Sequence, residues 1–158
     1  DPVRRLAALV NTDQQGAADI TAALKLSNAE QQRLTAMIAP DWDADWQISD
    51  NDLQTALYRL GAATVIDLAL LKWAEMLVAS PTGLGEVQDS WVRIIEAANQ
   101  ILSDGKINFP LKGQDVLDQG VAPGPLVSEL LGQVEDWWLA GGCTADREAC
   151  LAKLEALL

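Results

Sequence analysis

The sequence predicts an all-α protein: a multi-helix bundle of about seven to nine helices, with a helical body over 1–105 and a smaller helical tail over 106–158 that contains a Gly/Pro hairpin. Apolar residues recur at helical spacing along most of the chain. Residues that favour helix starts precede these stretches, and glycine or proline follows them. No convincing run alternates apolar and polar residues, so we expect no strands.

The first part of the body carries local signals for helix boundaries. Asp1 is the expected N-cap of a first helix, because a proline follows it at the first helical position. A second helix is expected over 15–26. Ser27 and Glu30 have the S-x-x-E spacing of a capping box, which begins a third helix. Pro40 ends that helix because proline cannot donate the next backbone hydrogen bond.

The sequence of the second part of the body predicts three longer helices. Ser49 or Asp50 caps the first of them, and Gly61 ends it. The run 62–78 is apolar on most faces, so we expect it to be the central helix of the bundle. A further amphipathic helix follows and ends at the turn 103–105.

The tail differs because Gly and Pro interrupt it repeatedly. Short helices are expected over 113–119 and 125–140, and a final helix after Thr144. Cys143 and Cys150 are roughly 10 Å apart if helical, at 1.5 Å per residue, which is beyond disulfide reach. Free thiols fit a reducing, cytoplasmic setting.

Charge and hydropathy limit the class of protein. The net charge is −12, and acids outnumber bases in each third of the chain, which argues against broad non-specific binding to nucleic acid. The apolar stretch 61–79 contains Asp67, Lys72 and Glu75, so we interpret it as a buried helix and not a membrane span. The chain opens without a secretory signal or an initiator Met, and we expect a piece of a longer protein.

No metal site or catalytic constellation is expected within this chain. The segment DWDADW (41–46) has alternating aspartates, but a calcium loop would need glycine and glutamate where the chain has Trp46 and Asp52. A two-metal site would need a phosphate cradle beside its carboxylates, and none is apparent. The sequence has no histidine and no phosphate-binding P-loop. We therefore expect a solvated connection at 41–46, no cofactor in this chain, and no activity of the chain alone.

The six tryptophans are expected to pack rather than to stack on bases. Trp73 and Trp91 lie on helix faces rich in Leu and Ile, which favours the core over a nucleic-acid surface. The adjacent residues Trp137 and Trp138 point to different faces of a helix, so one of them should be partly exposed.

The stretch FPLKGQDVLDQGVAPGPLVSELL (109–131) is the strongest functional signal in the residues themselves. Its glycines allow a backbone to approach a ligand closely, and the amides of such a hairpin and of the next helix start can meet a phosphate. Lys112 adds one positive charge in an otherwise acidic chain. The alternative is a plain αα-hairpin in which Gly and Pro only end helices.

The longer segment FPLKGQDVLDQGVAPGPLVSELLGQVEDWWLAGG (109–142) resembles the C-terminal part of the class II bacterial CCA tRNA nucleotidyltransferase and poly(A) polymerase family. The segments DPVRRLAALV (1–10) and LKLSNAEQQRLTAMI (24–38) are similar to the helical body of that family. The motif K-G-x-D followed by G-x-x-P-G-P is the most specific part of the resemblance.

The resemblance implies a parent enzyme that adds C, C and A to the 3′ end of tRNA, using CTP, ATP and magnesium. In this family those ligands bind a catalytic head and neck, which this sequence lacks. The body and tail support the tRNA, chiefly at its elbow. The implied partners are thus tRNA and the missing head and neck, and the RNA-binding candidates are Lys112, Gly113, Gly120 and Gly124, followed by Arg4, Arg5, Lys25 and Arg33.

Two alternatives stay open at this point. CCA addition and poly(A) addition cannot be separated, because the distinguishing residues of the family lie outside this sequence. The chain is alternatively an acidic all-helical protein-interaction or dimerisation module with no RNA role. An exposed apolar patch would favour that second reading.

Overall fold

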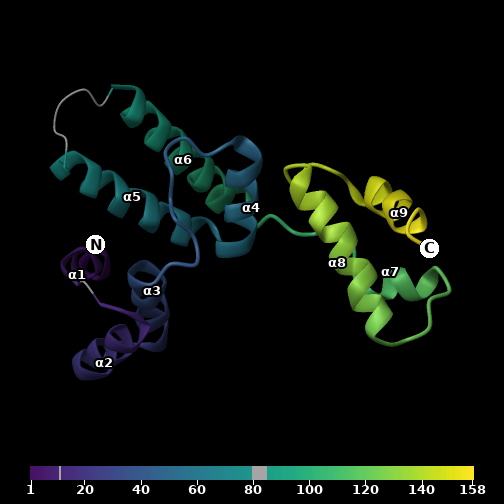
Figure 1. Ribbon diagram of the computed structural model, residues 1–158, viewed down its shortest axis with the longest axis horizontal. Helices are drawn as coiled ribbons and strands as arrows, with labels where there is room; N and C mark the ends of the chain where they lie inside the picture. Colours follow the sequence, from purple (N-terminus) through teal and green to yellow (C-terminus); the bar gives the residue numbers. More distant parts are fainter. Residues whose placement is uncertain (11, 80–84) are drawn as a thin grey trace. The chain divides into compact units, whose positions relative to one another are not determined.

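The computed structural model describes residues 1–10, 12–79 and 85–158, and within these ranges every regular element is a helix (Figure 1). The predicted all-α fold is therefore confirmed, and the number of helices lies in the expected range. The helices are α1 (Pro2–Leu9), α2 (Gln14–Leu24), α3 (Asn28–Ile38), α4 (Asp50–Leu60), α5 (Ala62–Ala79), α6 (Gly85–Asp104), α7 (Gly113–Asp118), α8 (Pro125–Ala140) and α9 (Arg147–Glu155).

The chain forms two compact units. The N-terminal unit contains Asp1–Ile48 and Leu60–Gly105, and the C-terminal unit contains Ser49–Arg59 and Lys106–Leu158. The sequence-based division placed all of 1–105 in one body, whereas α4 groups with the tail. Its side chains explain this difference, because Tyr58 of α4 contacts α8 through an aromatic pair and a hydrogen bond.

Side-chain caps fix most helix starts, as the sequence indicated. The Asp1 carboxylate accepts a hydrogen bond from the Arg4 N–H at 3.0 Å. Ser27 and Glu30 form the predicted capping box. The Ser49 hydroxyl accepts from the Asp52 N–H at 3.2 Å, which resolves the choice of cap for α4. At its other end Gly61 has φ +80°, the left-handed conformation that glycine adopts most easily.

The N-terminal unit is built on the pairing of α5 with α6, while α3 contacts α1, α2 and α5. Trp91, Ile94 and Ala98 of α6 are fully buried, at the spacing of one helix face. Val65 and Ala69 of α5 are equally buried. The central role predicted for 62–78 is thus confirmed for the first half of α5.

The C-terminal unit has its own core, which joins α7, α8 and α9. Its buried members are Leu111, Val116, Leu130, Val134, Trp138, Leu139, Cys150 and Leu154. Trp138 meets the rings of Tyr58 and Phe109 edge to face, with centroids 5.2 and 5.5 Å away. Trp137 is 38% exposed, so the predicted division of the Trp pair holds.

The two cysteines are free, and Cys150 is buried. Among the described helices none combines the length and the apolar character needed to cross a bilayer.

Candidate nucleic-acid interface

Lys112 stands immediately before α7, with its side chain exposed and its backbone held on both sides. Leu111 is 4% exposed and belongs to the core cluster of the C-terminal unit. The Lys112 N–H donates to Asp115 Oδ2 at 2.6 Å. Among the described residues the Lys112 ammonium has no ion-pair partner, although its positive charge also helps to lower the pKa of Asp115.

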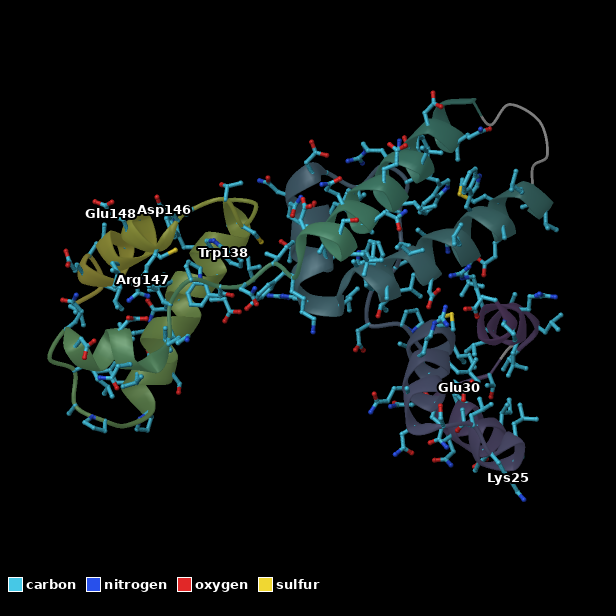
Figure 2. The ribbon with its side chains drawn as sticks, turned by 180° about the vertical axis from the view of Figure 1, so that it is seen from behind. Lys25, Glu30, Trp138, Asp146, Arg147 and Glu148 are labelled. Atoms are coloured by element: carbon cyan, nitrogen blue, oxygen red, sulfur yellow. The ribbon has the colours of Figure 1, made fainter. Side chains whose placement is uncertain are left out.

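Asp115 is the centre of a polar cluster that sequence reasoning missed. Its buried carboxylate also accepts hydrogen bonds from both terminal nitrogens of Arg147, one at Oδ2 over 3.1 Å and one at Oδ1. The Arg147 Nη1 further donates to the Pro110 carbonyl oxygen at 3.0 Å. Figure 2 shows Arg147 at the start of α9, turned toward the neighbouring helices of its unit.

The electrostatics of this cluster favour the ionised carboxylate. Hydrogen bonds from Arg147, followed by the backbone hydrogen bond from Lys112, lower the pKa of Asp115 below its ordinary value despite the opposing effect of burial. Arg147 is thus committed to Asp115, and its charge is largely neutralised within the unit.

The turn between α7 and α8 exposes an uncharged backbone. No charged residue lies between Asp118 and Glu129, and the glycines and prolines from 120 to 125 are all exposed. Gly120 has φ +86° and Gly124 has φ +159° with ψ −172°, conformations that suit glycine. The predicted hairpin is present between α7 and α8, and its glycines adopt backbone conformations that other residues rarely adopt.

The start of α8 lacks a side-chain cap, because its N-cap residue is Gly124. By contrast, an Asp or Ser side chain caps each of α1, α2, α3, α4 and α9. A Cβ placed on Gly113 would lie 3.7 Å from Val127 Cγ1, so the residue after Lys112 packs against the first turn of α8. The fold thus brings Lys112, Gly113 and the uncapped helix start into one neighbourhood.

Gly120 differs from the other tail candidates, since it lies at the opposite end of α7 from Lys112. A six-residue helix spans about 9 Å at 1.5 Å per residue.

The candidates Arg4 and Arg33 in the N-terminal unit converge on a buried acid. Asp67 of α5 is 2% exposed. It accepts from Arg4 Nε at 3.0 Å and from Arg33 Nε at 2.6 Å. Arg33 also reaches the Asp1 carboxylate at 2.8 Å. These two guanidinium groups join α1 and α3 to α5, and their charges are paired inside the fold.

Burial raises the pKa of Asp67, but the hydrogen bonds and charges of Arg33 and Arg4 outweigh it, so the pKa lies below its ordinary value. Arg5 and Lys25 are exposed and have no ion-pair partner among the described residues. Of the four weaker candidates, only these two keep a free charge. Figure 2 shows Lys25 at the end of α2, pointing away from the protein.

A metal site is not visible in the part of the chain that the structure describes, where no three acidic, cysteine or histidine side chains are grouped for one. Asp41, Asp43 and Asp45 are exposed, and Asp43 pairs with Lys72 at 3.4 Å.

Comparison with known proteins identifies no relative: no family model, no curated protein and no solved structure matches this chain.

Proposed function

We propose that this chain is the C-terminal body and tail of a tRNA CCA-adding nucleotidyltransferase or a related poly(A) polymerase, and that it supports the elbow of tRNA. The observation that carries the proposal is the free ammonium of Lys112 beside Gly113 and the uncapped start of α8. This arrangement offers one positive charge beside a helix start, in a unit whose acidic residues outnumber its basic ones.

The proposal assigns the chemistry to other parts of the same polypeptide. A head and neck would bind magnesium, CTP and ATP, and the enzyme would act in the cytoplasm. The residues described here would bind and orient tRNA, and they would perform no step of nucleotide transfer.

The test compares whole tRNA with an acceptor minihelix that lacks the elbow. Lys112→Ala and Gly124→Ala should each weaken binding of whole tRNA by about 1–2 kcal/mol, because each removes or blocks a phosphate contact. Minihelix binding should stay unchanged. Equal effects on both RNAs, with the fold intact by circular dichroism, would reduce the hairpin to a helix-ending turn.

The salt dependence of binding provides a second measurement. Because few positive charges are free, tRNA binding should be weaker than micromolar at physiological salt, and its salt slope should correspond to about two or three phosphates. A steep slope would contradict an interface limited to the residues named here.

A second candidate function is homodimerisation through an apolar surface of the N-terminal unit. Leu9 and Val78 are each 85% exposed, and Val78 lines a groove of about 370 Å³ between α1 and α5. The lining of this groove is apolar except for Glu75, and a contiguous apolar surface favours a protein contact. Sedimentation equilibrium should then show a dimer that Val78→Lys dissociates, and a monomer at all concentrations would exclude this candidate.

A further inference from the structure

We propose that Arg147 is a positioning residue, which fixes the backbone of residues 110–115 and thereby sets where Lys112 can meet a phosphate. This inference rests on the proposed tRNA-binding function. It adds a residue that lies outside the K-G-x-D and G-x-x-P-G-P motifs.

The geometry of Arg147 spans the segment that carries Lys112. One guanidinium group donates to the Pro110 carbonyl on one side of Lys112 and to the Asp115 carboxylate on the other. The same carboxylate accepts from the Lys112 N–H at 2.6 Å. Arg147 therefore holds the backbone before and after Lys112, without touching the lysine side chain.

The contacts of this segment restrict its backbone but leave the lysine side chain free. Leu111 is buried and Gly113 packs on Val127, so the main chain on either side of Lys112 has little freedom. A charged group on an anchored backbone loses less conformational freedom on binding than one on a mobile loop. Arg147 contributes to binding by this route.

The core of the unit does not depend on Arg147. The Arg147 side chain is 54% exposed, whereas Cys150 and Leu154 of the same helix are fully buried against Val134 and Trp138. Replacing Arg147 with glutamine should therefore leave α8 and α9 packed and release only the segment before α7.

A first experiment needs no RNA and uses the 158-residue chain. Amide hydrogen exchange by NMR should show faster exchange of the Lys112 N–H in Arg147→Gln, by at least about tenfold, because the carboxylate that accepts this bond loses its anchor. Arg59→Gln is the matched control, since Arg59 is an exposed arginine of the same unit. Unchanged exchange at Lys112 would overturn the proposal.

A second experiment is a double-substitution cycle on tRNA binding, using a tRNA transcript that lacks its 3′ CCA. Lys112→Ala should raise Kd about tenfold, and Arg147→Gln should raise it by a similar or smaller factor. In the Lys112→Ala background, Arg147→Gln should have no further effect, because its action passes through Lys112. Arg147→Lys should restore little of the loss, since an ammonium lacks the two-pronged geometry.

The outcomes separate this inference from the function on which it rests. Additive effects of the two substitutions would mean that Arg147 contacts RNA by itself, which would overturn the positioning role and leave tRNA binding in place. No effect of Lys112→Ala on tRNA would refute the proposed interface, and the positioning role with it.

Discussion

Arg33 donates from Nε to Asp67 Oδ2 over 2.6 Å, and this pair links α3 to the buried face of α5. Arg4 adds α1 by donating to Asp67 Oδ1. The sequence had suggested both arginines as RNA ligands and Asp67 only as a break in an apolar stretch. In the fold the three form one network, in which both guanidinium groups are paired with the buried Asp67 carboxylate.

We predict that Asp67→Asn lowers the free energy of unfolding by about 3 kcal/mol, because two guanidinium groups lose a buried carboxylate partner. Urea denaturation followed by circular dichroism measures this change. Glu96→Gln is the control: Glu96 is exposed on α6 and has no ion-pair partner among the described residues, so its loss should cost less than about 0.5 kcal/mol. Similar effects of the two substitutions would show that the network contributes nothing.

The low pKa values of Asp67 and Asp115 predict a loss of stability in acid. In the unfolded chain the pKa of an aspartate is about 3.9, and in the fold the pKa of both groups is lower. Their contribution is therefore complete above the unfolded pKa and decreases as the pH falls through the folded values. Urea midpoints measured from neutral pH down to about 3 should fall less steeply in Asp67→Asn than in the native chain. Parallel curves would contradict the assignment.

The sequence predicted the structural features that are determined by residues a few positions apart, such as helix caps and helix ends. The capping box of Ser27 and Glu30, the glycine at the end of α4 and the helices on both sides of the Gly/Pro turn are all encoded within a few positions, and all are present. No local pattern predicted the ion pairs between residues that are far apart in the sequence. Asp115 and Arg147 are 32 positions apart, and Arg4 and Asp67 are 63 apart.

The lack of a local signal for long-range contacts also explains why the sequence analysis placed α4 in the body and missed part of the candidate site. Nothing in the sequence of α4 distinguishes an apolar stripe that packs on α5 from one that packs on the tail. The contacts of Tyr58 with Trp138 and Glu135 assign α4 to the C-terminal unit. Lys112 was found because it precedes a glycine-rich motif. Whether the Lys112 ammonium forms an ion pair depends on acidic side chains that are distant in the sequence. A local sequence pattern does not show which of them lie near it.

Tyr58 provides a direct probe of the C-terminal unit, since it is the sole tyrosine of the chain. Burial, followed by its hydrogen bond to Glu135 at 2.5 Å, raises the pKa of Tyr58 to about 12. Ultraviolet titration should show tyrosinate forming near that pH in the folded protein and at a pH of about 10 in urea. Because the folded pKa is the higher one, this contribution to stability is complete below the unfolded pKa and is lost as the pH rises toward the folded value.

Glu135→Gln is the test of the cause. It removes the charge that opposes ionisation, so the pKa of Tyr58 should fall toward its ordinary value while burial keeps part of the shift. Asp136→Asn is the matched control on the adjacent, exposed residue, and it should leave the titration unchanged. An unshifted pKa in the native chain would mean that Tyr58 does not pack against Trp138 and Glu135 as described.

Two glycines of the C-terminal unit should respond to alanine with opposite signs. Gly132 lies within α8, and a Cβ there would meet no atom within 4 Å, so Gly132→Ala should raise stability by about 0.5–1 kcal/mol through helix propensity. Gly120 has equally open space but φ +86°, so Gly120→Ala should cost about 1–2 kcal/mol through backbone strain alone. Thermal melting of both variants measures the two changes in stability. Because sterics are matched, equal shifts would show that the turn after α7 does not require the left-handed conformation.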